Sequence, residues 1–211
     1  MKGTFLYNNK ITDMPIFPSF RFVKPIIGER RVLDVGCGVG RYLENFSEES
    51  TGIEFSVPSI KKCRKKGLKV IRGDVNKGLS VKSKQFEVIF ASHIIEHVES
   101  PFYFLEEANR VLKPNGMIIL GFPVEKSLAR VFGDHYFDGH QDHLYSFSID
   151  CIKRLLDRTG FRVEKVIFDV NFVGRFPIFT PFLYVANFLP PIFVIWWSNA
   201  VWIVARKNDR I

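Results

Sequence analysis

Three glycines stand at alternate positions in the segment Asp34-Val35-Gly36-Cys37-Gly38-Val39-Gly40. They follow an apolar run, 32–35, that only Asp34 interrupts, and they precede an amphipathic run, 42–46. Because glycine carries no Cβ, such a turn lets the backbone approach a ligand, and a helix start behind it offers N–H groups. The segment therefore suits a nucleotide-like ligand. Asp34 would accept hydrogen bonds from the turn or face an ammonium group on that ligand.

The spacing of these glycines differs from the dinucleotide-binding pattern G-x-G-x-x-G. After Gly36 and Gly38, the third glycine of that pattern would stand at position 41, which is occupied by Arg41, whereas the third glycine is Gly40. The chain has 211 residues, which leaves no room for the second domain of a two-domain dehydrogenase. An NAD-dependent enzyme is therefore disfavoured.

Polar residues also stand where further apolar runs end, namely Glu54, Asp74, Ser92 and His93. Ligands of parallel sheets bind at the carboxyl ends of the strands, so these side chains are candidates for one site. Glu54 would accept hydrogen bonds from ribose hydroxyls, although it also suits a solvated strand end. Asp74 would accept from an adenine amino group beside the N–H of Val75, or cap a turn. Phe55 would stack on the adenine or pack in the core.

Apolar periodicity indicates the elements that must position these residues. We expect strands at 31–35, 50–54, 69–72, 86–91, 117–121, 162–168 and 200–205, and helices at about 19–26, 39–46, 56–66, 101–112 and 148–159. Ser56 and Pro58 form a helix-start signature for the third of these helices. Strands that alternate with helices predict a parallel sheet covered on both faces.

The chain length fits a single domain of residues 1–211, with an N-terminal arm or cap at 1–29, a core at 30–170, a hydrophobic insertion at 171–199 and a last strand at 200–206. Residues 176–205 include no charged residue. Four prolines cut this run into pieces too short to cross a membrane (Pro177, Pro181, Pro190 and Pro191). We expect segment 176–197 to cover the active-site mouth, form a homodimer contact or touch a membrane surface peripherally.

Composition narrows the classes of partner and compartment. Three cysteines at scattered spacings form neither a disulfide framework nor a zinc cluster, and the N-terminus shows no signal-peptide pattern, so we expect a cytoplasmic protein. The formal net charge is +8, and part of it lies in the run 61–66, which suits the solvated face of a helix. The basic-aromatic alternation of an RNA-binding sheet is absent from the sequence, so we expect no nucleic acid partner.

Several strings together resemble the successive motifs of class I S-adenosylmethionine (SAM) dependent methyltransferases. They are 34–40, Gly52-Ile53-Glu54, Gly73-Asp74-Val75, the run 86–97 and Lys113-Pro114-Asn115-Gly116, while Glu96-His97-Val98 resembles the ubiquinone/menaquinone-type branch, similar to methyltransferase type 11. The resemblance implies an α/β, Rossmann-like doubly wound sheet of seven strands with the last strand antiparallel and helices on both faces. It also implies SAM as methyl donor and S-adenosylhomocysteine as product. The implied cofactor-binding residues are Asp34, Gly36, Cys37, Gly38, Glu54, Phe55, Asp74, Val75, Ser92 and His93.

The methyl acceptor is expected to be a small molecule, apolar or lipid-linked, and its site is less defined by the sequence. The segment 140–148 resembles one that closes over the acceptor pocket in related methyltransferases, which makes His143 or His140 the candidate base; a helix-capping role is the alternative. His93-x-x-Glu96-His97 has the spacing of metal ligands, but some quinone-type relatives have Glu in the first place, so we expect no metal. The alternative function is a methyltransferase-fold binding or membrane-associated assembly module without turnover.

Overall fold

The structure is a computed structural model that describes residues 13, 15–123, 143–169, 198 and 200–208. Seven strands form one sheet in the order β3-β2-β1-β4-β5-β7-β6. The strands are β1 (Val32–Val35), β2 (Thr51–Glu54), β3 (Val70–Arg72), β4 (Phe86–Ser92), β5 (Leu112–Pro123), β6 (Phe161–Asp169) and β7 (Ala200–Lys207). All neighbours pair in parallel except β7, which is antiparallel to β5 and β6. The predicted seven-stranded sheet with an antiparallel last strand is therefore confirmed.

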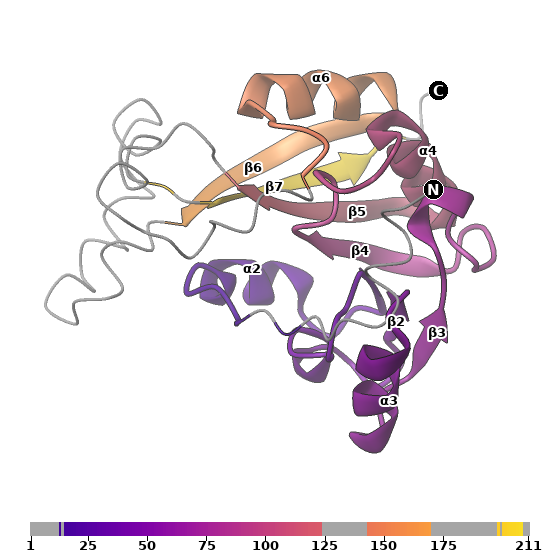
Figure 1. The fold of residues 1–211 in the computed structure, drawn as a ribbon. Helices are drawn as coiled ribbons and strands as arrows, with labels where there is room; N and C mark the ends of the chain where they lie inside the picture. The colour runs from indigo at the N-terminus through magenta and orange to yellow at the C-terminus, as the bar shows by residue number, and fades with distance from the viewer. Residues whose placement is uncertain (1–12, 14, 124–142, 170–197, 199, 209–211) are drawn as a thin grey trace, which may run out of the picture.

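Helices cover both faces of this sheet (Figure 1). They are α2 (Phe20–Ile27), α3 (Val57–Lys65), α4 (Pro101–Val111) and α6 (Ile149–Arg158), with 3-10 turns η1 (Leu43–Asn45) and η2 (Val75–Lys77). Local chemistry explains where the longer ones begin, since the hydroxyls of Ser56, Ser100 and Ser148 each accept an N–H from the first helical turn. The start predicted at Ser56 is thus confirmed.

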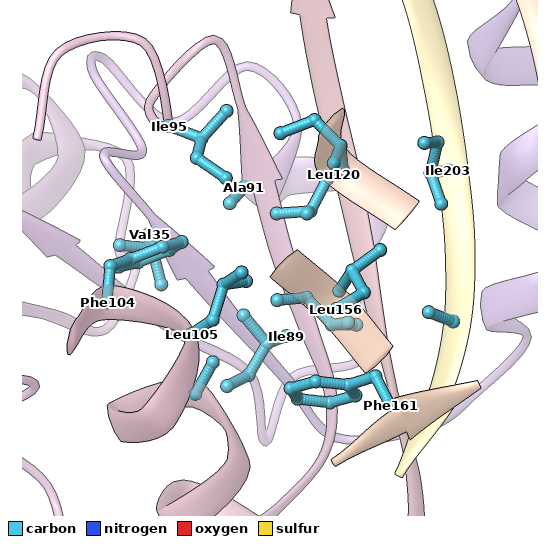
Figure 2. Packing of buried hydrophobic residues seen from close by; sticks show 14 of the residues in the cluster. Val35, Ile89, Ala91, Ile95, Phe104, Leu105, Leu120, Leu156, Phe161 and Ile203 are labelled. Carbon is cyan, nitrogen blue, oxygen red and sulfur yellow. The ribbon is translucent and has the colours of Figure 1, made fainter. Parts of the chain in front are cut away.

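Alternate residues of β4 supply the two halves of the core. Ile89 and Ala91 pack with side chains of α4 and α6, such as Leu105 and Leu156 (Figure 2). Phe90 points to the opposite face, where it packs with α2. Both β1 and β4 are buried on both faces, as expected for central strands of a parallel sheet, and they therefore read as nearly continuous apolar runs.

The helix predicted at 39–46 is wrong. Only the single turn η1 forms there, because Gly40 adopts a φ of +82°, which an α-helix does not accommodate. A Cβ at Gly40 would also lie 2.4 Å from Leu68 Cδ1, so the tight turn is required by packing as well as by φ. The irregular segment after β1 therefore extends to η1, where the sequence pattern predicted a helix from residue 39.

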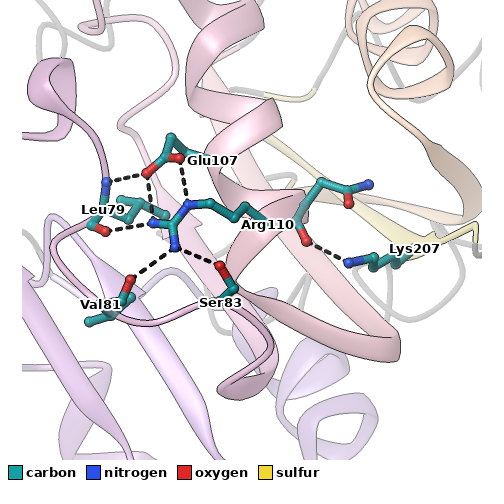
Figure 3. Close-up of polar contacts among 7 residues, drawn as sticks. Leu79, Val81, Ser83, Glu107, Arg110 and Lys207 are labelled. Atoms are coloured by element: carbon teal, nitrogen blue, oxygen red, sulfur yellow. Dashed lines mark hydrogen bonds and ion pairs between the residues drawn. The ribbon is translucent and has the colours of Figure 1, made fainter.

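A polar network joins α4 to the segment that precedes β4 (Figure 3). Arg110 donates to both carboxylate oxygens of Glu107, one turn earlier on α4, at 2.6 and 2.8 Å. The same guanidinium donates to the carbonyl oxygens of Leu79 and Val81 and to the Ser83 hydroxyl. The network fixes the segment that leads into β4.

Among the residues that the structure describes, no helix has the length and apolarity needed to cross a membrane. The hydrophobic segment 176–197, for which the sequence offered three roles, lies outside these residues, as does His140. Both therefore stay at the level of sequence-based predictions.

Candidate functional site

The glycine turn leaves β1 at the carboxyl edge of the sheet and is tied to the neighbouring strand. The backbone N–H groups of Gly36 and Cys37 donate to the carbonyl oxygen of Ile53 at 2.8 and 3.1 Å. Gly36 has a φ of +69°, and a Cβ there would lie 2.0 Å from Cδ1 of Ile94. Glycine is thus needed at position 36 for backbone conformation and for space.

Glu54, at the end of β2, is buried and holds this turn from the other side. Its Oε2 accepts a hydrogen bond from the N–H of Gly38 at 2.8 Å. Its Oε1 accepts from the N–H groups of Phe55 and Ser56 at 2.8 and 2.7 Å. A carboxylate has about four acceptor positions, so these three bonds leave acceptor capacity for a ligand hydroxyl.

Asp34 is a buried carboxyl group within β1, and the side chain is only 2% exposed. Burial first, and then Cys63 and Glu54, raise the pKa of Asp34 well above its usual range. Its Oδ2 is buried and has no hydrogen-bond partner among the described residues. Since an unpaired buried carboxylate is costly, a cationic ligand group beside Asp34 would relieve that cost.

A cavity opens between the glycine turn and the end of β4. Its lining combines predicted residues with others that the sequence did not single out: Asp34, Gly36, Cys37, Gly38, Val39, Arg41, Tyr42, Ser92, His93 and Ile94. Six of the ten predicted cofactor residues therefore border one cavity. The other four, Glu54, Phe55, Asp74 and Val75, lie outside this lining.

Asp74 and Phe55, both predicted to contact the adenine, have contacts of their own within the chain. Asp74 Oδ1 accepts from the N–H of Asn76 at 3.1 Å and caps η2, which is the turn-capping alternative for this residue. The guanidinium carbon of Arg72 lies 5.9 Å from the centre of the half-buried Phe55 ring. Roles of Asp74, Val75 and Phe55 in binding adenine stay predictions.

His93 follows β4 directly and is held in an unusual conformation, with a φ of +54°. Its N–H donates to the carbonyl oxygen of Gly121 at 2.8 Å, and its ring stacks on Phe17 at 4.8 Å between centroids. Nδ1 lies 3.2 Å from Oε1 of Glu96, a fully buried carboxylate. Burial alone would raise the pKa of Glu96, but the hydrogen bond and charge of His93 outweigh it and lower that pKa.

Sequence analysis missed a further buried acid at the carboxyl edge, Asp169, the last residue of β6. Its Oδ2 accepts from the Ser19 hydroxyl at 2.6 Å, and that hydroxyl accepts from Nε1 of Trp202 at 2.7 Å. Burial raises the pKa of Asp169 to about 6, although hydrogen bonds from Ser19 and the charge of His93 oppose the rise. The available signal was an acid at the end of an apolar strand, but the strand was expected to stop at Phe168.

Tyr42 is a second residue that the sequence did not single out. It is buried, lines the cavity, and its hydroxyl accepts from the N–H of Phe17 at 3.0 Å. Burial raises the pKa of Tyr42 above its usual value. Together with the stack on His93, this contact fastens the segment that precedes α2 against the cavity wall.

The candidate base His143 lies near the cavity without lining it. Its ring meets that of His97 edge-on at 4.7 Å, and the adjacent Leu144 N–H donates to the carbonyl oxygen of Glu96 at 2.8 Å. Donor atoms of Glu96, His97 and His143 lie within 4.8 Å of one another. We assign none of the three as a metal ligand, since Glu96 is engaged by His93; the absence of a metal stays a prediction, as does a catalytic role for His143 or His140.

A family model described as a methyltransferase domain matches residues 18–166. An uncharacterised protein of Methanocaldococcus jannaschii is 36% identical over 101 residues, 47% of each chain. A ubiquinone biosynthesis O-methyltransferase of Histophilus somni is 29% identical over 103 residues, 43% of each chain.

A crystal structure of a SAM dependent methyltransferase from Archaeoglobus fulgidus shares the fold, with a TM-score of 0.64 and 26% identity over 89% of this chain and 90% of that chain. The chain spans about half the length of the curated relatives it matches, 47% and 43% for the two above. The match to the family model, in contrast, covers most of the described core, including the glycine turn and β4.

Proposed function

Because this chain belongs to the methyltransferase-domain family of SAM-dependent proteins, we propose that it transfers a methyl group from SAM to a small acceptor molecule. The observation that carries the proposal is the buried Asp34 carboxylate, which faces a cavity beside the glycine turn and has an oxygen without a hydrogen-bond partner among the described residues. A bound amino-acid ammonium group would pair with it. The residues therefore fit the methionine part of SAM.

The other donor-side residues fit the remaining parts of the same molecule. Gly36 and Gly38 would let the backbone approach the methionine part, and Glu54 would accept from the ribose hydroxyls with its remaining acceptor capacity. Asp74 and Val75 would hold the adenine. Ser92 and His93 line the opposite side of the cavity and would face the reacting group.

SAM would supply a methyl group on a sulfonium, which is already activated for in-line displacement. The chain therefore has to align the acceptor atom, exclude water and accept a proton if that atom carries one. The acceptor that we propose is small and apolar or lipid-linked. Support comes from Tyr42, which lines the cavity, from Phe17, which stacks on the cavity residue His93, and from the name of the Histophilus somni relative.

Isothermal titration with S-adenosylhomocysteine tests the donor site without knowledge of the acceptor. The wild type should bind, and Asp34→Asn should weaken binding at least about tenfold, equivalent to about 1.4 kcal/mol. Asp157→Asn makes the same chemical change on an exposed helix position and should leave the affinity unchanged. Absence of binding by the folded wild type would overturn the proposal.

A second candidate function is a membrane-associated binding or assembly module that does not turn over. The charge-free aromatic segment 176–197 and the net charge of +8 favour it. Flotation with liposomes of anionic lipid, comparing the full chain with a variant whose exposed lysines in 61–66 are changed to glutamine, measures the electrostatic part of such docking. Normal turnover on a soluble acceptor without vesicles would count against the module. The competing possibility is that segment 176–197 forms a homodimer contact. Light scattering tests it by measuring the molar mass of the protein in solution.

A further inference from the structure

His93 stands out among the cavity residues because its backbone is strained. A φ of +54° is uncommon for a residue with a side chain, and such strain persists where the surroundings hold it in place. Here the hydrogen bond to Gly121 and the stack on Phe17 do so. The strain turns the imidazole into the wall of the cavity that also contains Asp34 and Gly36.

Glu96 sets the direction of the His93 ring. The carboxylate is fully buried, and its Oε1 lies 3.2 Å from Nδ1. A carboxylate at one ring nitrogen orients the imidazole and stabilises its protonated form, as in hydrolases with a histidine base. Proton exchange with an acceptor therefore falls to Nε2.

Acidic side chains are the most numerous ionisable groups around this imidazole. The titratable and charged groups that face it are Glu96 from its own loop, Asp169 from the end of β6, and Asp34, Arg41 and Tyr42 around the cavity. Three of the five are carboxyl groups, and Arg41 is ion-paired with Asp13. His93 thus stands between acids contributed by three different strands or loops.

We propose that His93 is the general base of the methyl transfer, and that the acceptor is a phenolic hydroxyl compound. The inference rests on the proposed function. In the step, Nε2 takes the hydroxyl proton while the oxygen lone pair forms a bond to the methyl carbon. The carbon–sulfur bond breaks, and its electron pair returns to sulfur, which leaves a neutral thioether and an imidazolium that loses its proton to water.

The acceptor class follows from matching acidities. A phenol has an ordinary pKa near 10, within about four units of an ordinary histidine near 6.5, so proton transfer can accompany attack. An aliphatic hydroxyl is closer to water, whose pKa is about 15.7, and so gives a histidine base a smaller driving force than a phenol does. The aromatic ring of a phenol also suits a cavity whose lining includes the rings of Tyr42 and His93.

The test uses the full-length protein, SAM, and a panel of substituted phenols with and without an apolar side chain. We expect turnover by the wild type, a fall in kcat/KM of about 100- to 10,000-fold in His93→Asn, and loss of the acidic limb of the pH profile in that variant. Asparagine tolerates a positive φ, so the variant should fold. Added imidazole should restore part of the rate in His93→Gly.

Glu96→Gln checks the positioning role of the carboxylate. Loss of its negative charge should move the acidic limb of the kcat/KM profile to lower pH, which a merely structural role would not do. S-adenosylhomocysteine titration of the wild type separates the proposed function from this inference, since it measures donor binding without an acceptor. A folded wild type that fails to bind would overturn the proposed function itself.

Three results would overturn this inference while leaving the proposed function standing. One is donor binding by the wild type without turnover of any phenol. The second is a His93→Asn variant that keeps both its rate and its acidic limb. The third is loss of the acidic limb of the pH profile in His143→Asn but not in His93→Asn. That result would make His143, the residue that the sequence favoured, the base.

Discussion

The carboxylate of Glu54 accepts a hydrogen bond from the N–H of Gly38 at 2.8 Å, so the end of β2 and the middle of the glycine turn share one buried charge. The same carboxylate also caps the N–H groups of Phe55 and Ser56. Glu54 therefore shapes the proposed donor site in addition to any contact with ribose. Glu54, which the sequence predicts as a ligand contact, thus also acts as a clamp: its carboxylate holds the glycine turn against the end of β2.

Glu54→Gln should consequently weaken binding of S-adenosylhomocysteine at least about tenfold and lower the free energy of unfolding. Hydrogen bonds to a charged acceptor are worth about 1.5–3 kcal/mol, and the amide of glutamine turns one acceptor into a donor that faces backbone N–H groups. Titration calorimetry and urea denaturation measure the two effects. Glu106→Gln, at an exposed position of α4, serves as control; equal affinities for the two variants would contradict the clamp.

Asp169 predicts a stability that depends on pH. Its pKa is about 6 in the folded chain and 3.8 in the reference state, so the folded state binds the proton more tightly. The free energy of unfolding should therefore fall as pH rises from about 4 to about 6. About two pKa units correspond to about 3 kcal/mol.

Asp169→Asn should remove this part of the pH dependence and be more stable than the wild type above pH 7, because an amide oxygen still accepts from Ser19 without burying a charge. Urea unfolding at several pH values between about 4 and 8 measures it. Asp34, whose pKa is also raised, leaves a residual slope of the same sign. Asp157→Asn serves as the control and should keep the pH dependence of the wild type. If Asp169→Asn also keeps it, the assignment to Asp169 is refuted.

Gly121 in β5 and Trp202 in β7 are directly opposite in the antiparallel pair. A Cβ at position 121 would lie 2.6 Å from Cζ3 of the indole, which is held by its bond to Ser19 and by stacking on Phe90 at 5.3 Å. Gly121→Ala should therefore cost about 1–3 kcal/mol through overpacking. In the double variant with Trp202→Phe the cost should be smaller than the sum of the single changes, and simple additivity would argue against a steric cause.

The residues around the glycine turn could be grouped from the sequence because their signals are local. Asp34, Gly36 and Glu54 stand at fixed positions relative to apolar runs, and the sheet brings strand ends together without further information. The buried acid Asp169 could not be found in this way, because its contacts join residues remote in sequence. Ser19 and Asp169 are 150 positions apart, and no local pattern connects them. His93 appeared in the prediction as a cofactor contact, since the strain and the Glu96 contact that distinguish it are visible only in three dimensions.

Boundaries failed where glycine and asparagine adopt unusual backbone angles. The positive φ of Gly40 prevents the helix expected at 39–46 from forming. The segment Lys113–Gly116 lies between the expected helix at 101–112 and the expected strand at 117–121 but belongs to β5, with Asn115 at a φ of +58°. In both places the hydrophobic pattern was correct, and the backbone angle that decided the element was not encoded in that pattern.

The Glu107–Arg110 pair gives a prediction for stability without an effect on the site. Arg110→Ala removes the guanidinium that joins α4 to Leu79, Val81 and Ser83, and should cost about 1.5–3 kcal/mol. The pKa of Glu107 is lowered by Arg110, so the benefit of the pair is present above a pH of about 4.5 and is lost as pH falls through the lowered pKa. Arg110→Lys should recover only part, because an ammonium lacks the planar fork. As a control, Arg154→Ala, at an exposed position of α6, should change the free energy of unfolding by less than about 0.5 kcal/mol. The affinity for S-adenosylhomocysteine should be unchanged in all three variants, which would confirm that this network supports the sheet rather than the donor site.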